Sequence, residues 1–459
     1  MGHPLIPAPF RFPPYDAAFE KNLCRASRDE IRAVQSERIR HLAQYAYENV
    51  PFYRARWRHA GVNPQDIRSI DDLAKIPSWN VDDQRADMDA HPPFGSFYGA
   101  DFANDTSFIL STSGTTGMPR LSAVSFRDMP GLKDNFGRVY RYLGLGPKDL
   151  MHITFTYATM GAAWACTWAA EAAGIGIVPA SSGRITASER QIDLIRRAGV
   201  TAITGTASFI LHLANTAIDL GYDPASWKVR TIITAGEIAS ESVRQRLEQL
   251  WGAKVFDLFG SVDALTWVCC DCEASRAVHG KLGMHIWEDI CTVEILGADG
   301  RPLPSGEYGE MCITTWSLKT SPRIRFRTGD VTAVRTDICA CGRTLARLMP
   351  ISGRADHTLR IHAQSIFPMA LENAVLSADE GIKEWYAEAV AVDGKDRLRI
   401  HIEHTLADDQ HYRAKIEASL RHRLNLGSTD IVLHAPGSTA SITGAGAEQK
   451  IRRIFDRRT

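Results

Sequence analysis

Residues 111–120 read STSGTTGMPR and place five hydroxyl side chains, two glycines and one cation within ten positions. The preceding run, residues 107–110 (SFIL), predicts a strand, so this polar stretch begins where a strand ends. Hydroxyl groups donate hydrogen bonds, Gly114 and Gly117 let the backbone approach a ligand closely, and Arg120 adds a full positive charge. The stretch therefore predicts an anion-binding loop whose natural ligand is a polyphosphate.

The spacing of this loop differs from that of nucleotide hydrolases, in which GxxxxGK is followed by Ser or Thr. A polar turn without a ligand is the alternative interpretation, because Ser, Thr and Gly are common in loops.

Beyond the loop, short apolar runs alternate with amphipathic helical patterns. Helices are predicted at residues 29–50, where Pro51 ends the pattern, and at 187–198 and 240–251; strands are predicted at 107–110, 150–155, 175–179, 202–204, 231–234 and 255–258. This alternation predicts an α/β fold with a mostly parallel sheet flanked by helices, and ligands beyond the carboxyl ends of the strands.

Two later regions depart from this pattern. Residues 291–315 combine strands with turn signals and predict an antiparallel β subdomain. After residue 352, a strand at 397–404, a helix at 409–424 and a strand at 430–434 predict a small α+β C-terminal domain.

The composition favours a small-molecule enzyme. Lys plus Arg (53) equal Asp plus Glu (53) and no basic run stands out, which argues against a nucleic-acid partner. The N-terminus is broken by prolines and does not resemble a signal peptide. Residues 153–180 are mostly Ala, Gly and Thr around Glu171, which is more typical of a buried core segment than of a membrane span. We therefore expect a cytoplasmic protein.

Nine cysteines, an odd number, argue against a disulfide framework in a chain of this kind. Five of them form two clusters, Cys269, Cys270 and Cys272 in one, and Cys339 and Cys341 in the other. A metal site or buried free thiols are the two interpretations.

The residue order of the predicted anion-binding loop, residues 111–120, which we call the phosphate loop, resembles that of the adenylate-forming superfamily. This superfamily includes acyl-CoA synthetases, peptide-synthetase adenylation domains and luciferases. Further segments are similar to its phenylacetate-CoA ligase-like branch and occur in the same order along the chain. They are residues 49–54 (NVPFYR), 67–73 (IRSIDDL), 235–237 (AGE), 257–263 (DLFGSVD), 284–289 (MHIWED), 325–330 (RFRTGD), 353–356 (GRAD) and 450–458 (KIRRIFDRR). The resemblance implies a large ATP- and acid-binding domain, residues 1–352, and a small mobile domain, residues 353–459, joined by a hinge near Asp356.

The resemblance also implies the chemistry. An aromatic carboxylate attacks the α-phosphate of ATP, pyrophosphate leaves, and the acyl-adenylate passes its acyl group to CoA. Lys450 and Arg120 would stabilise the charge on the phosphates, Asp263 would hold Mg²⁺, and Asp330 would bind the ribose hydroxyls. The other ATP-binding residues implied are Ser111, Thr112, Ser113, Gly114, Thr115, Thr116, Gly117, Ala235, Gly236, Glu237, Asp257, Phe259, Gly260 and Arg354.

The acid pocket is expected along residues 155–164, which combine aromatic with small side chains that suit a flat ring. The candidates are Tyr157, Met160 and Gly161, together with Gly260. Ordinary core packing is the alternative for each of them.

Four departures from the family pattern leave open both the acceptor, through Ala363, and turnover itself, through Arg120, Val262 and Asp263. Arg120 stands in place of Lys, Val262 in place of Ser or Thr, Asp263 in place of Glu, and Ala363 in place of a Gly that lines the pantetheine channel. CoA is the first acceptor considered, and an amine or another small nucleophile is the second. A nucleotide-binding relative without turnover is the third interpretation. The sequence predicts no oligomeric state.

Some members of this branch carry a similar cysteine arrangement that looks like a structural zinc site. The resemblance implies Cys272, His279, Cys339 and Cys341 as its ligands, with Cys270 or His285 as possible substitutes.

Overall fold

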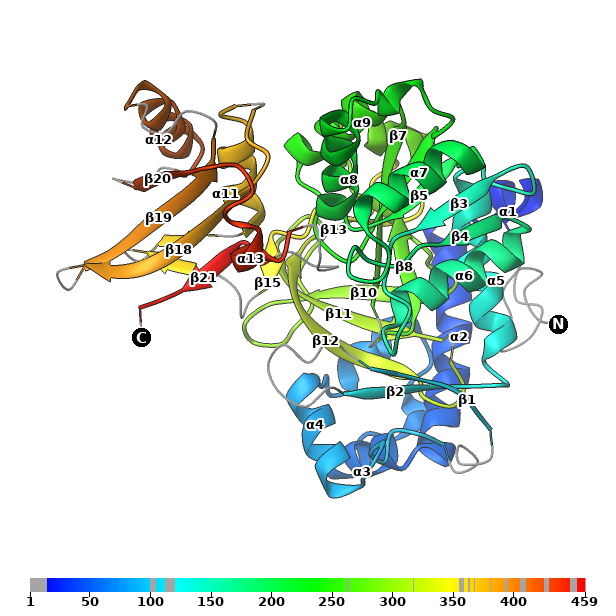
Figure 1. Ribbon diagram of the computed structural model, residues 1–459. Coiled ribbons are helices and arrows are strands. Elements are labelled where there is room, and N and C mark those ends of the chain that lie inside the picture. Colours follow the sequence, from blue (N-terminus) through cyan, green and yellow to red (C-terminus); the bar gives the residue numbers. More distant parts are fainter. Residues whose placement is uncertain are drawn as a thin grey trace. The chain divides into compact units, whose positions relative to one another are not determined.

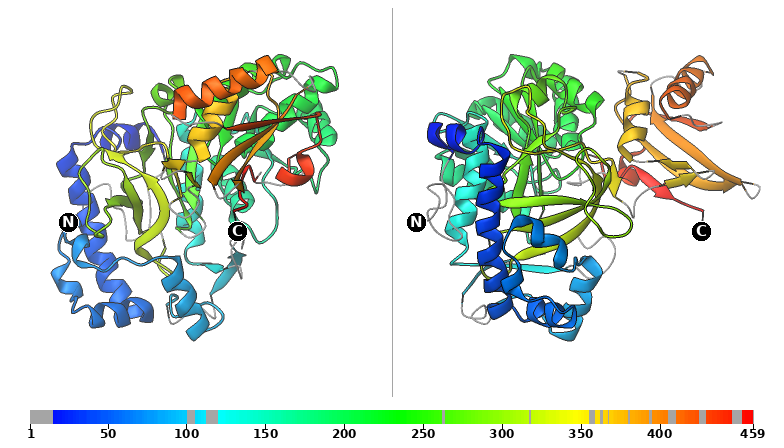
Figure 2. Two further views of the ribbon diagram at one scale, coloured as in Figure 1. Left: turned by 90° about the vertical axis from the view of Figure 1, so that its left-hand side faces the viewer. Right: turned by 180° about the vertical axis from the view of Figure 1, so that it is seen from behind.

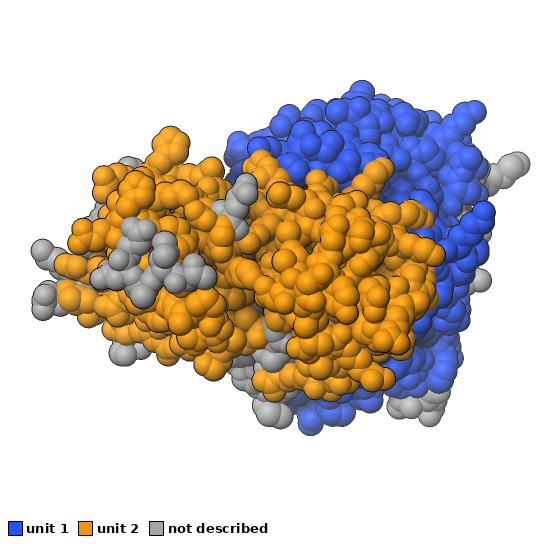
Figure 3. Space-filling view, turned by 45° about the horizontal axis from the view of Figure 1, so that its top comes forward, with its two compact units in different colours: residues 1–149, 157–177, 257–351 blue, residues 150–156, 178–256, 352–459 orange. Residues whose placement is uncertain are grey.

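The computed structural model describes residues 15–99, 105–111, 120–261, 264–316, 318–354, 359–361, 364–366, 368–379, 381–392, 395–404, 410–424, 429–445 and 452–458. They form a mixed α/β fold (Figure 1), as the sequence predicts. The chain divides into two compact units (Figure 3). The first contains residues 1–149, 157–177 and 257–351, and the second contains residues 150–156, 178–256 and 352–459.

The first unit opens with helices. Its longest, α2 (Arg28–Asn49), begins at a capping box between Ser27 and Glu30 and ends before Pro51, which starts α3 (Figure 2). The prediction of a helix ended by Pro51 is thus confirmed. The unit's other helices are α1 (Ala17–Asn22), α3 (Pro51–His59), η1 (Pro64–Asp66), η2 (Ile70–Lys75), α4 (Val81–Ala90), α5 (Met129–Tyr142), α6 (Gly161–Ala173) and α10 (Glu273–Ala277).

Three antiparallel groups of strands complete the first unit. β1 (Thr106–Ser111) pairs only with β2 (Leu121–Ser125) among the described strands. The prediction that residues 107–110 join the parallel sheet is therefore wrong, because β1 and β2 form a separate two-stranded antiparallel sheet among the described strands. β10 (Cys291–Leu296), β11 (Gly309–Thr315) and β12 (Arg323–Thr332) form the predicted antiparallel subdomain.

The third group runs from β7 (Lys254–Ser261) through β8 (Thr266–Cys270), β9 (Met284–Ile286) and β14 (Arg347–Leu348) to β13 (Val334–Arg335). Their apolar side chains share one core with β10 and β11.

The second unit contains the predicted parallel strands. β3 (Leu150–Ile153), β5 (Ala202–Gly205) and β6 (Thr231–Thr234) pair in parallel, and β4 (Gly176–Pro179) lies beyond β3. The connecting helices are α7 (Ser188–Ala198), α8 (Ala207–Asp219), η4 (Pro224–Ser226) and α9 (Glu241–Trp251). Their apolar faces and the strands bury one continuous core.

The C-terminal part of this unit is a small sheet covered by two helices. The sheet order is β20 (Asp430–His434), β19 (Lys395–Glu403), β18 (Trp385–Val392) and β21 (Ile454–Asp456), and α11 (Pro368–Leu376) and α12 (Gln410–Leu424) pack on one face of it (Figures 1 and 2). This confirms the predicted strand, helix and strand. The short elements are β15 (Gly353–Arg354), β16 (Leu359–Ile361), β17 (Gln364–Ile366) and α13 (Ala440–Thr443).

Among the described residues, no helix combines the length and the apolar character needed to cross a bilayer. Within the apolar stretch 153–180, α6 buries most of its Ala side chains together with Trp168.

Candidate functional site

The two ends of the predicted phosphate loop, residues 111–120, are fixed by the pairing of β1 with β2. Ser111, the last residue of β1, pairs with Leu121, and Arg120 stands directly before β2. Several predicted residues lie outside the described part of the chain, namely Thr112, Ser113, Gly114, Thr115, Thr116, Gly117, Asp263 and Lys450. The predicted strand before Ser111 is confirmed as β1, and the roles of these residues stay predictions.

Ser111 joins the phosphate loop to the predicted acid side. Its amide donates to the Thr159 carbonyl at 2.7 Å, and its hydroxyl donates to Thr159 Oγ1, also at 2.7 Å. Thr159 directly precedes Met160, which starts α6 as its N-cap, and Gly161 is the first helical residue. The structure therefore brings Ser111 beside the segment that carries Met160 and Gly161.

Arg120 has a partner that the sequence does not reveal. Its Nη1 donates to Gln84 Oε1 at 2.8 Å, and Gln84 is 3 % exposed on α4. These residues are 36 positions apart, so no local pattern could have found the pair.

Aromatic side chains line the segment around Tyr157. The Tyr157 and Trp164 rings meet edge to face at 5.5 Å, and Phe108 of β1 lies 5.5 Å from Trp164. Tyr157 Oη and Thr167 Oγ1 share a hydrogen bond of 2.8 Å, and burial raises the pKa of Tyr157. The segment thus offers an aromatic wall with one phenolic hydroxyl held in place.

Gly260 requires the absence of a side chain. A Cβ at this position would lie 2.6 Å from Trp267 Cδ1 and 3.0 Å from the Thr266 carbonyl oxygen. Trp267 contacts Phe136 at 4.9 Å, and Trp168 continues the row 6.3 Å from Phe136. Trp168 in turn lies 5.0 Å from Phe108. A chain of rings therefore connects Gly260 to the wall at Phe108. The spacing of aromatic residues in α5 and α6 is the feature of the sequence that could have indicated this chain.

The other predicted residues of the first unit lie on β7 and β12. The Asp257 amide donates to Asp271 Oδ2 at 2.8 Å, and Phe259 pairs with Cys269 across the sheet. Asp330 follows Gly329, whose φ of 82° marks a bend within β12, and its amide donates to Thr328 Oγ1 at 3.1 Å. These contacts fix the backbone at each position.

The AGE turn lies in the second unit, directly after β6. The Ala235 amide donates to the Gly205 carbonyl at 3.0 Å, and Gly236 takes a φ of 82°. Glu237 accepts a 2.5 Å hydrogen bond from the Ser208 amide. The turn therefore stands at the carboxyl ends of β5 and β6, where the alternating pattern predicts ligands. Arg354 forms β15 with Gly353 in the same unit.

Glu237 also lines a narrow crevice with Glu372 and Arg453. Burial is the main reason why the pKa of Glu372 rises to about 7; Arg453 opposes this shift and Glu237 adds to it. Arg453 is held in turn by Glu384, whose carboxylate accepts at 2.9 Å. No sequence motif marks this carboxylate pair.

Four side chains of the first unit form a candidate metal centre. The ligand atoms of Cys272, His285, Cys339 and Cys341 all lie within 4.8 Å of one another. The sulfur atoms of Cys272 and Cys339 are 3.8 Å apart. A tetrahedral ion with Zn–S bonds of about 2.3 Å would set its sulfur ligands about 3.8 Å apart. Three thiols and one imidazole therefore fit zinc in both chemistry and spacing.

The surroundings of this cluster orient its ligands. His285 Nδ1 lies 3.3 Å from the Leu345 carbonyl, which suits Nδ1–H as the donor and leaves Nε2, 3.3 Å from Cys341 Sγ, as the ligand atom. The Ser275 amide donates to Cys272 Sγ at 3.4 Å. Hydrogen bonding with Cys272, and then with His285, lowers the pKa of the Cys341 thiol although burial opposes this. A lowered pKa favours the thiolate that metals bind.

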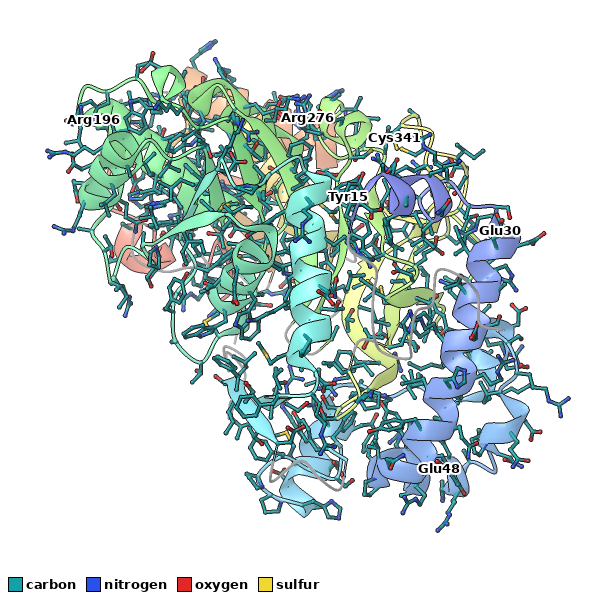
Figure 4. The ribbon with its side chains drawn as sticks, turned by 90° about the vertical axis from the view of Figure 1, so that its right-hand side faces the viewer. Tyr15, Glu30, Glu48, Arg196, Arg276 and Cys341 are labelled. Atoms are coloured by element: carbon teal, nitrogen blue, oxygen red, sulfur yellow. The ribbon has the colours of Figure 1, made fainter. Side chains whose placement is uncertain are left out.

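The ligand set differs from the first one predicted. His279 lies in the turn after α10, with a φ of 52°, and is not in the cluster. His285, named as a substitute, takes its place because β9 pairs with β8 next to Cys272. Cys270, the other substitute, is buried in β8. Figure 4 labels Cys341 of this cluster and Tyr15, whose hydroxyl accepts from Arg343 at 3.4 Å.

Comparisons with known proteins match nearly the whole chain. The AMP-binding enzyme family matches residues 62–318, and the AMP-binding enzyme C-terminal domain matches residues 363–458. A phenylacetate-coenzyme A ligase of Escherichia coli K12 is 31 % identical over 94 % of this chain and 96 % of the relative. One of Thermus thermophilus is 28 % identical over 96 % and 99 %. A crystal structure of 2-hydroxyisobutyryl-CoA ligase with 2-HIB-AMP is 25 % identical and covers 97 % of this chain and 94 % of that chain, with a TM-score of 0.87.

Proposed function

Because the chain belongs to the AMP-binding enzyme family, in its phenylacetate-CoA ligase-like branch, and is an AMP-forming acid–CoA ligase, we propose that its acid substrate is an aromatic carboxylic acid. The acid and ATP form an acyl-adenylate and pyrophosphate, and CoA then displaces AMP to give the thioester. In the first half-reaction a carboxylate oxygen bonds to the α-phosphorus, and the bond from that phosphorus to pyrophosphate breaks. In the second, the CoA sulfur bonds to the carbonyl carbon, and the bond from that carbon to AMP breaks.

The aromatic wall next to Ser111 is the observation that carries this proposal. The Trp164 ring lies 5.5 Å from the Phe108 ring and 5.5 Å from the Tyr157 ring, and Thr159 in the same segment bonds to Ser111 at the start of the phosphate loop. An acid whose ring stacks against this wall would present its carboxylate toward that loop. We assign four residues to the acid-binding pocket, namely Tyr157, Met160, Gly161 and Gly260.

Charge handling explains the remaining roles. Negative charge builds up at the phosphates in the first half-reaction, so Arg120 and Lys450 stabilise the transition state more than the ground state. Asp263 would hold Mg²⁺, which when bound neutralises and orients the phosphate oxygens. Asp330 and the 235–237 turn would bind the nucleoside, and Arg354 marks the start of the mobile domain. The family matches at residues 62–318 and 363–458 support a division into domains 1–352 and 353–459 with a hinge near Asp356.

A structural zinc ion at Cys272, His285, Cys339 and Cys341 is the second part of the proposal. A site closed by four protein ligands has no open position for a substrate, so its role is to join segments. The 339–342 turn already accepts a hydrogen bond from Arg25 at its Gly342 carbonyl, and Arg343 pairs with Glu20 at 3.1 Å. Zinc here would therefore stabilise the packing of the N-terminal helices.

An ATP–pyrophosphate exchange assay with a panel of acids tests the substrate class. Phenylacetate, benzoate and their hydroxylated forms are compared with 2-hydroxyisobutyrate, each at equal concentration. We expect at least one aromatic acid to exceed 2-hydroxyisobutyrate at least tenfold in kcat/KM. A preference for the aliphatic hydroxy acid would overturn the assignment of an aromatic substrate.

A further inference from the structure

The hydrogen bond between Arg120 and Gln84 bears on the replacement of the family's Lys by Arg in the phosphate loop. The Arg120 guanidinium donates through Nη1 to Gln84 Oε1 at 2.8 Å. Gln84 is 3 % exposed, so this side-chain amide is largely shielded from water. A buried amide oxygen needs a donor, and the guanidinium supplies one.

The helix that carries Gln84 is firmly anchored. Asn80 is the N-cap of α4, and its side chain accepts hydrogen bonds from the Asp82 and Asp83 backbone amides. The backbone amide of Gln84 donates to the Asn80 carbonyl at 3.2 Å. Arg56 pairs with Asp83 at 3.0 Å. Just before the helix, the Trp79 indole donates to the Ile324 carbonyl at 2.7 Å. Gln84 is therefore a fixed acceptor rather than a side chain that follows Arg120.

The chemistry of this pair suits the orientation of a cation that must bind an anion. A carboxylate in place of Gln84 would oppose the charge of Arg120, whereas the amide oxygen of Gln84 accepts the hydrogen bond without adding a negative charge. A guanidinium is planar with five N–H donors, so one bond to a fixed acceptor restricts the orientation of its plane and thereby the directions in which its other N–H groups point. An ammonium has no such plane, and a Lys would gain less from the same acceptor.

We propose that Gln84 is a positioning residue that holds the Arg120 guanidinium in the orientation that binds the β- and γ-phosphates of ATP. The proposal rests on the adenylation activity described above. It assigns a role in nucleotide binding to a helix far from the loop in sequence, and it makes Arg120 and Gln84 one functional unit.

A double-mutant cycle of Gln84→Met, Arg120→Lys and the double variant tests this unit by ATP–pyrophosphate exchange. We expect Gln84→Met to raise the KM for ATP and lower kcat/KM for ATP about tenfold, the loss typical of one hydrogen bond to a charged group. The KM for the acid stays unchanged. Arg120→Lys retains exchange with a similar loss, and the double variant loses no more than Arg120→Lys alone.

Two further variants separate positioning from stability. Gln84→Glu keeps the shape but neutralises the guanidinium, so we expect a larger rise in the KM for ATP than in Gln84→Met. Gln35→Met is the matched control, because Gln35 is also 3 % exposed on a helix of the first unit and donates to Glu288 at 3.4 Å. It should lower the Tm without changing the KM for ATP.

The proposal is overturned if Gln84→Met lowers the Tm as Gln35→Met does but leaves the KM for ATP unchanged, or if the two losses multiply in the double variant. If none of the acids tested supports pyrophosphate exchange by the wild-type protein, the proposed function itself is contradicted. The two failures are therefore distinguishable.

Discussion

Ser111 and Thr159 are joined by two hydrogen bonds of 2.7 Å, one from the Ser111 amide to the Thr159 carbonyl and one between their hydroxyls. Through this pair the strand that opens the phosphate loop is tied to the start of α6. Movement of one of these two segments, which we propose bind ATP and the acid, should therefore affect the other.

Replacing Thr159 with Val removes the hydroxyl pair and keeps the backbone bond. We expect the KM for ATP and the KM for the acid to rise together by roughly threefold to tenfold, since one neutral hydrogen bond is worth about 1 kcal/mol. Steady-state kinetics with each substrate varied in turn measures this. A change in only one of the two KM values would show that the two segments act independently.

Replacing Gly260 with Ala should lower adenylation at least tenfold. The new Cβ would meet Trp267 at 2.6 Å and the Thr266 carbonyl at 3.0 Å, so strand β7 or the Trp267 ring must move. Gly146→Ala is the matched control, because a Cβ there meets nothing within 4 Å. Equal adenylation activity of the two variants would contradict the assignment of Gly260 to the site.

Zinc content checks the metal centre. We expect about one zinc ion per chain by elemental analysis of the purified protein, and its loss in His285→Ala and Cys341→Ser, with a fall in Tm for both. His279→Ala should keep the metal, because His279 is not in the cluster. Full zinc in His285→Ala, or none in the wild type, would refute the site.

The stability of the second unit should depend on pH through Glu372. Its pKa is raised to about 7, so between about pH 4.5 and 7 the folded chain holds a proton that the unfolded chain has lost. The contribution of Glu372 to the free energy of unfolding therefore falls as the pH rises through this window and is constant above it.

Urea unfolding at pH 5 and pH 8 measures this contribution. Glu372→Gln should gain stability relative to wild type on going from pH 5 to pH 8, and Glu417→Gln on α12 serves as the control. A difference between wild type and Glu372→Gln that is the same at both pH values would contradict the assignment.

Regular elements were predictable from the sequence where their pattern is local. Amphipathic spacing indicates burial on one side in α2, α7 and α9, and apolar runs indicate burial on both sides in β5 and β6. Each of these patterns lies within a single segment, so it can be recognised without knowing what the segment packs against. The pairing of β1 with β2 was not predictable in this way, because the apolar run of a strand does not specify which other strand it pairs with.

The candidate site divides along the same line. The phosphate loop, the AGE turn and the cysteine pairs are short motifs, so they could be proposed as site residues from the sequence alone. The choice of His285 over His279 depends on the register between β8 and β9, and the Arg120–Gln84 bond joins segments 36 residues apart. Contacts of this kind arise from tertiary packing, which single-sequence patterns do not encode.

The most direct test of the central claim is product analysis by mass spectrometry after incubation with ATP, Mg²⁺, CoA and the aromatic acid preferred in the exchange assay. We predict an aryl-acyl-CoA thioester and AMP in equal amounts, with only slow AMP release when CoA is omitted. Pyrophosphate exchange without any thioester, or a thioester formed only from an aliphatic acid, would contradict an aromatic acid–CoA ligase.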